Sequence, residues 1–114
     1  MTTDDFVDLN VPGLLLRYSN PSDHWHEIVL AFAATRLHVF QKYDLISQDA
    51  SALRGPIEEA VVRFSDYTPL GQKFVMSGAV DKWLASCDRK RNKDAYRDPG
   101  PLERRVQRFL STIG

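Results

Sequence analysis

The pattern of apolar positions is most regular between Asn20 and Tyr43, and it predicts the helix around which the rest of the chain is built. Asn20 followed by Pro21 is typical of a helix start, and no Gly or Pro interrupts residues 22–43. Apolar residues recur at helical spacing in one broad stripe. The stripe consists of Trp25, Val29, Phe32, Val39, Phe40 and Tyr43, widened by Ile28, Ala33 and Leu37. So wide an apolar surface predicts a helix packed by several neighbours, with Phe32 and Phe40 in the core.

One charged residue, Arg36, projects from the middle of this stripe. An unpaired buried charge is costly, so its guanidinium must reach solvent along the aliphatic stem or find an acidic partner. The acidic residues near the N-terminus, Asp4, Asp5 and Asp8, are expected to be solvated and not to form a metal cluster.

The N-terminal segment contains two short apolar runs, Phe6–Val11 and Leu14–Tyr18, separated by Pro12-Gly13. A Pro-Gly pair is a turn signal, so the runs predict short strands or an extended arm. An isolated hairpin is marginally stable in water, so this arm must pack across the helices. Residues 1–5 are expected to be disordered.

Further helical patterns follow the long helix. Ile57, Ala60, Val61 and Phe64 form a stripe after Pro56, Thr68-Pro69 again resembles a helix start, and Val80, Trp83, Leu84 and Cys87 share a face. A single helical turn is expected at residues 51–54. Helices are then expected at residues 56–67, at residues 69–76, from residue 79 to the polar run that begins near 87, and at residues 101–114. The run of residues 72–76 is also compatible with a strand, because a short apolar run does not decide between the two.

Together these patterns predict a mainly α protein. Residues 1–114 are expected to form a single compact domain of four to five helices with an extended N-terminal arm. The alternative is an α+β fold with a small sheet, in which Leu14–Tyr18 and Lys73–Met76 are strands.

Composition places the chain among ordinary globular proteins. Of its 114 residues, 43% are hydrophobic and 26% are charged, which argues against general disorder. The single cysteine, Cys87, excludes an internal disulfide framework and a multi-cysteine zinc site. The acidic, polar N-terminus does not resemble a signal peptide, and no apolar run approaches the roughly 20 residues that span a membrane. The sequence therefore predicts a cytoplasmic protein without a membrane partner.

The charges are unevenly distributed although they sum to zero. Residues 1–68 contain ten acidic and five basic residues, whereas residues 69–114 contain five acidic and ten basic residues. Opposite charge of this kind favours attraction within one fold, between copies in a homo-oligomer, or with a separate partner.

Candidates for chemistry are few. His24 and Glu27 have the spacing of half a carboxylate–histidine metal site, but no second pair of that kind exists, and His26 and His38 do not supply one. Cys87 lies on an apolar stripe and is expected to be a small buried hydrophobe. Phosphate-loop, dinucleotide and serine-nucleophile signatures are absent from the sequence. We therefore expect no metal, no cofactor and no enzymatic activity.

The remaining candidate is a basic region in the C-terminal half. Its residues are Arg89, Lys90, Arg91, Lys93, Tyr96, Arg97, Arg104, Arg105 and Arg108. Four acidic residues between 88 and 103 reduce its eight positive charges to a net +4. We expect a small non-enzymatic protein-binding module, such as a regulator, inhibitor or adaptor, that uses this region to meet an acidic protein surface. The alternative is nucleic-acid binding, with Tyr96 stacking on a base.

Overall fold

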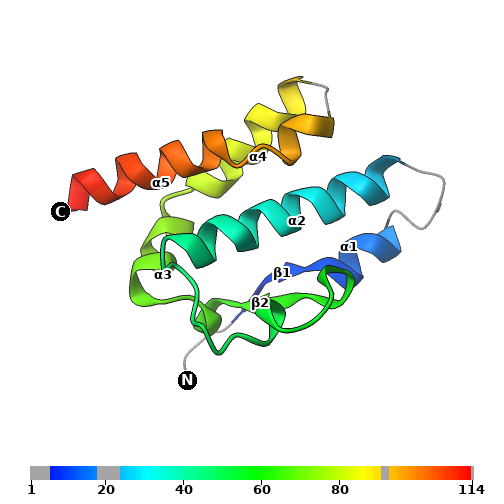
Figure 1. Ribbon diagram of the computed structural model, residues 1–114, viewed down its shortest axis with the longest axis horizontal. Helices are drawn as coiled ribbons and strands as arrows, with labels where there is room; N and C mark the ends of the chain where they lie inside the picture. The colour runs from blue at the N-terminus through cyan, green and yellow to red at the C-terminus, as the bar shows by residue number, and fades with distance from the viewer. Residues whose placement is uncertain (1–5, 18–23, 91–92, 114) are drawn as a thin grey trace.

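The long helix is the middle of three layers in the computed structural model, which describes residues 6–17, 24–90 and 93–113 (Figure 1). Two short strands, β1 (Val7–Asn10) and β2 (Val61–Arg63), form an antiparallel pair on one side of it, and α4 and α5 lie on the other side. The five α-helices of the described part are α1 (Val11–Arg17), α2 (His24–Lys42), α3 (Pro69–Met76), α4 (Ala79–Lys90) and α5 (Gly100–Ile113). The prediction of a mainly α fold with four to five helices is confirmed, and the extended arm includes β1.

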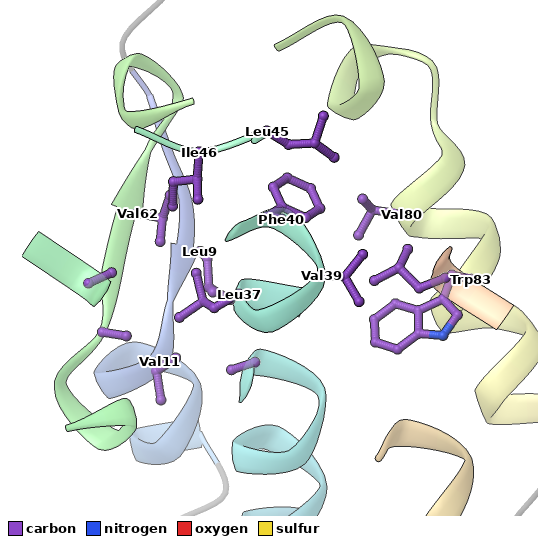
Figure 2. Close-up of a cluster of buried hydrophobic side chains, with 14 of the residues drawn as sticks. Leu9, Val11, Leu37, Val39, Phe40, Leu45, Ile46, Val62, Val80 and Trp83 are labelled. Atoms are coloured by element: carbon purple, nitrogen blue, oxygen red, sulfur yellow. The ribbon is translucent and has the colours of Figure 1, made fainter. Parts of the chain in front are cut away.

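Helix α2 is packed on opposite sides, as its broad apolar stripe predicts. Figure 2 shows Leu37 pointing towards the sheet and Val39 pointing towards Trp83 of α4, with Phe40 between them. Phe40 and Val39 are fully buried. The stripe is not core throughout, however, because Trp25 in the first turn is 43% exposed. Phe32, predicted to be buried, is only partly so. The expected start of the helix at Asn20 and Pro21 lies outside the described residues.

The N-terminal arm differs from the prediction after Asn10, because Pro12-Gly13 is not a turn. The Asn10 side chain accepts a hydrogen bond from the Gly13 N–H at 3.1 Å and so caps α1. Pro12 occupies the first turn of the helix, where its missing N–H is not needed. The predicted strand at Leu14–Tyr18 is therefore wrong, since residues 14–17 are helical and Tyr18 lies outside the described residues.

The helix predicted for residues 56–67 is also wrong. This segment consists of a 3-10 turn at Ile57–Glu59, strand β2 and a second 3-10 turn at Phe64–Asp66. The backbone N–H of Phe64 donates to the Phe6 carbonyl at 2.9 Å, and the two rings stack with centroids 5.1 Å apart. Pairing with a strand more than 50 residues away in the sequence thus overrides a helical pattern that contains two adjacent β-branched valines.

The second half of the chain follows the prediction closely. The Thr68 hydroxyl accepts from the Gly71 N–H at 3.1 Å and caps α3, so residues 72–76, including the alternative strand Lys73–Met76, are helical. In α4, Val80, Trp83 and Cys87 are buried. The expected single turn near residue 51 is present as a 3-10 turn, and α5 begins one residue before the predicted position.

Gly71 permits the closest backbone contact of α3. A Cβ atom at this position would lie 1.7 Å from the carbonyl oxygen of Leu45, which is backbone and cannot turn aside. The same Leu45 carbonyl accepts a hydrogen bond from the Thr68 N–H at 3.1 Å. The segment that follows α2 is therefore seated directly on the start of α3, and only glycine fits between them.

The charge of Arg36 is satisfied by Asp8 and Tyr67. Arg36 is 6% exposed, and its Nη2 donates to a carboxylate oxygen of Asp8 and, at 2.6 Å, to the Tyr67 hydroxyl. The Tyr67 hydroxyl in turn donates to the same Asp8 oxygen at 2.5 Å. The expectation that Arg36 finds an acidic partner is confirmed, whereas the expectation that Asp8 is solvated is wrong.

A β-bulge explains how Asp8 reaches α2. Successive side chains of a regular strand point to opposite faces, so Asp8 and the buried Leu9 could not both face the same helix. The register with β2 shifts between Val7 and Leu9, and such a shift re-aims a side chain. Leu9 can then pack near Leu37 (Figure 2) while Asp8 binds Arg36.

The buried ring of Phe40 provides a direct test of the core. We expect Phe40→Ala to lower the free energy of unfolding by about 3–5 kcal/mol, because it removes a fully buried ring that neighbours cannot replace. The loss caused by Phe32→Ala should be smaller than that caused by Phe40→Ala by at least about 1 kcal/mol, because Phe32 is only partly buried. Urea denaturation of both variants measures this, and equal losses would contradict the placement of Phe32.

Gly71 gives a second stability prediction. Gly71→Ala should destabilise the protein by about 3 kcal/mol, the upper end of the usual cost of overpacking, because backbone must move to make room. Gly55→Ala is the control, since a Cβ at Gly55 has no atom within 4 Å. Thermal melts of the two variants should differ clearly, and an unchanged melting temperature for Gly71→Ala would rule out the close approach to Leu45.

The Asp8–Arg36 pair predicts a non-additive double mutant. Asp8→Ala leaves a buried guanidinium without its counter-charge and should cost about 3–5 kcal/mol. Arg36→Met in addition removes the stranded charge and should restore part of that loss. Denaturant titration of the single and double variants gives the coupling energy, and simple additivity would mean that the two residues do not interact.

Candidate functional site

A hollow of about 460 Å³ opens between two walls of the fold, with α2 as its floor. One wall is formed by β1 and α1, and the other by the end of α3 and the first half of α4. The lining residues are Val7, Asp8, Leu9, Asn10, Gly13, Leu14, Arg17, Phe32, Arg36, Val75, Val80, Asp81 and Leu84. All four residues of β1 line it and no residue of β2 does, so it lies along the side of β1 that faces away from β2.

The apolar part of the lining comes from all three elements around the hollow. Leu14 of α1, Phe32 of α2 and Leu84 of α4 are each partly buried and line it. Phe32 belongs to the stripe that predicts a core helix, but its neighbours leave one side of it open. The hollow thus explains why this aromatic residue is not in the core.

The polar part is dominated by Arg36 and Asp8. Besides the bonds that Arg36 makes through Nη2, its Nε is buried and has no hydrogen-bond partner among the described residues. Burial raises the pKa of the Tyr67 hydroxyl, so Tyr67 stays protonated and remains a donor to Asp8. Two further charges, Arg17 and Asp81, stand on opposite walls, and neither forms an ion pair within the described part of the chain.

The basic region predicted from the sequence is divided between two places. Arg89 and Lys90 lie in the exposed last turn of α4, whereas Arg104 and Arg108 are exposed one turn apart on α5 and Arg105 is half-buried. Figure 1 shows α5 running away from the end of α4, so the two groups lie on separate stretches of helix. Arg91 and the side chain of Lys93 lie outside the described residues.

Tyr96, the aromatic residue of this region, is not on the surface. It is 5% exposed, and its hydroxyl donates to Asp88. Its carbonyl accepts from the Thr35 hydroxyl of α2 at 2.7 Å, which holds the segment between α4 and α5 against the central helix. A ring in this position is not available to stack on a nucleic-acid base.

Three ion pairs change the balance of charge around α5. Arg97 lies 3.6 Å from Asp94 and 3.9 Å from Glu27, both at exposed positions. Lys42 donates to Glu103 at 2.5 Å, and this hydrogen bond lowers the pKa of Glu103. Glu103 is therefore turned towards α2, and the described part of the chain offers no ion-pair partner to Arg104, Arg105 or Arg108.

The fold also places two oppositely charged segments of the chain on opposite sides of α2. Residues 44–66, which follow α2 and include β2, contain five acidic and two basic residues, a formal charge of −3. Residues 88–108 contain four acidic and eight basic residues, a formal charge of +4. Figure 1 shows the first segment below α2, and α5 with the end of α4 above it, so the two segments lie apart within one molecule.

Other candidates from the sequence have ordinary structural surroundings. Cys87 is buried, and burial raises the pKa of its thiol, which disfavours the nucleophilic thiolate. Within residues 6–17, 24–90 and 93–113 no group of three or more His, Cys, Asp or Glu side chains is placed to hold a metal ion, and the side chain of His24 lies outside this description. No helix in the same ranges is both long and apolar enough to span a membrane.

Comparison with known proteins adds no relative from which a role could be carried over. No protein-family model, curated protein or solved structure matches this chain.

Proposed function

We propose that this protein is a small non-enzymatic protein-binding module, of the kind that serves as a regulator, inhibitor or adaptor. The observation that carries the proposal is the separation of charge across α2, with −3 in residues 44–66 and +4 in residues 88–108. Complementary potentials of this kind steer two proteins together and set their orientation.

The docking face is the outer surface of α5. Arg104 and Arg108 are exposed there without an ion-pair partner in the described part of the chain, and Glu103 is engaged by Lys42 and does not neutralise them. A partner that presents carboxylates would satisfy these guanidinium groups, which suit paired contacts with carboxylate oxygens.

The partner to which this charge pattern points first is a second copy of the chain. Residues 44–66 supply an acidic surface opposite to α5, so one molecule can meet the next head to tail. Such a heterologous contact joins different surfaces and grows into a ring or an open chain.

Nucleic-acid binding by the same arginines is the second candidate. It is favoured by the unpaired guanidinium groups of α5, but it lacks the exposed aromatic residue, because Tyr96 is buried. Its affinity would fall with salt with a log–log slope of about −0.9 for each phosphate contacted on duplex DNA.

Self-association at two salt concentrations tests the proposal. We expect the mean mass in sedimentation velocity to rise with protein concentration at about 0.02 M salt and to return to the monomer at about 0.5 M salt, where charges are strongly screened. Arg104→Ala with Arg108→Ala should weaken the association by roughly 2- to 30-fold, since exposed ion pairs typically contribute about 0.2–1 kcal/mol each.

Lys73→Ala with Lys82→Ala removes the same charge from exposed positions on α3 and α4 and is the matched control. A protein that stays monomeric at low salt and high concentration would contradict head-to-tail association. Salt-sensitive binding to short random DNA or RNA in fluorescence anisotropy, lost in the Arg104→Ala, Arg108→Ala variant, would favour the nucleic-acid alternative.

A further inference from the structure

The hollow beside β1 is a feature of the surface that does not involve the arginines of α5. Strand β1 pairs with β2 through Val7–Arg63, Leu9–Val62 and Asn10–Val61, and the sheet of the described part has only these two strands. Among the described residues, no strand pairs with the other edge of β1. An open edge presents backbone N–H and C=O groups that can pair with another chain.

This edge borders an unfilled space. All four β1 residues line the hollow, and α4 forms its far wall through Val80, Asp81 and Leu84. Four residues of strand extend about 13 Å, so the hollow runs beside a length of backbone that a short extended peptide can follow. A strand added here would lie between β1 and α4, above the floor formed by α2.

The floor offers polar groups that match a peptide backbone. Arg36 is 6% exposed and lines the hollow, and its buried Nε has no hydrogen-bond partner in the described part of the chain. Asp8 lines the same space and places a carboxylate beside that guanidinium. Because the pair is neutral as a unit, it suits a group with both a donor and an acceptor, as an amide has, better than a free anion.

Side-chain chemistry further defines the occupant. Leu14, Phe32 and Leu84 form an apolar patch for one aliphatic or aromatic side chain. Arg17 on the α1 wall and Asp81 on the α4 wall have no ion-pair partner in the described part of the chain, and each can be matched by an opposite charge. The complementary ligand has an apolar residue flanked by an acidic residue towards α1 and a basic residue towards α4.

We propose that the hollow binds an extended segment of another protein, which adds a strand to the open edge of β1. Main-chain hydrogen bonds to β1 would hold the segment, and the apolar patch with its two flanking charges would select its sequence. This site is separate from the basic face of α5, so either can fail without the other.

The test starts from a phage-displayed library of random linear heptapeptides selected on the full-length protein. A selected peptide, labelled with fluorescein, is titrated against the protein by anisotropy. We expect Leu84→Trp to weaken binding by at least about tenfold, because the larger side chain fills the hollow. Leu16→Ala should change the affinity by less than about twofold, because it leaves the contact site intact. Leu16 is exposed on α1 and does not line the hollow, so it is the matched control.

Two readouts identify an added strand. Methylation of single backbone nitrogens of the peptide should weaken binding at every second position by about 3- to 10-fold, because alternate N–H groups of a strand point to the same neighbour. Backbone amides of β1 should gain protection from hydrogen exchange when the peptide binds. These readouts do not depend on Leu84→Trp, whose fold is checked by its thermal melt.

Several outcomes would overturn the inference. These are failure to select any peptide, binding that is unaffected by Leu84→Trp, and N-methyl effects without a period of two. Binding that is lost only in the Arg104→Ala, Arg108→Ala variant would assign the peptide to α5, in agreement with the proposed function and against a site at β1.

Discussion

The burial of Arg36 in the middle of an apolar helix face is the constraint on which the rest of the structure depends. A guanidinium that is 6% exposed needs a counter-charge within reach, and the nearest elements along the chain do not supply one. Asp8 supplies it from 28 residues upstream, and the Tyr67 hydroxyl adds a hydrogen-bond acceptor from 31 residues downstream, so one side chain joins three distant segments. The bulge in β1, the pairing of β1 with β2 and the position of the turn before α3 are all consistent with this one requirement.

How far the sequence predicts the fold varies with the range of the interactions. α3, α4 and α5 have local signals, such as the Thr68-Pro69 start and the spacing of Val80, Trp83 and Cys87, and these are found where expected. Residues 56–67 also carry a helical pattern, but their strand is stabilised by a partner from the N-terminus, which no local pattern shows. Asn10 two residues before Pro12 is typical of a helix start, but the Pro-Gly pair is the stronger signal and indicates a turn.

The same reasoning explains which parts of the candidate sites could be predicted. The charge asymmetry is visible in the sequence, although its separation across α2 depends on the layer order. The hollow could not be predicted, because its lining combines residues of β1, α1, α2, α3 and α4. The sequence feature that indicates something unusual in this region is Arg36, a charged residue within an apolar stripe. Phe32, by contrast, has the pattern of a core residue, and only the arrangement of its neighbours leaves it open.

The position of α4 across from β1 has a consequence for the solubility of the protein. A bare strand edge can be joined by the edge of another sheet, and repetition of that step produces aggregates. Here β1 is recessed, because α4 and α1 stand beside it and the α2 floor lies beneath it. A folded sheet is broader than a single extended chain, so these walls obstruct its approach more. On the proposed role of the hollow, the same walls would leave the edge open to one peptide while hindering uncontrolled pairing of sheets.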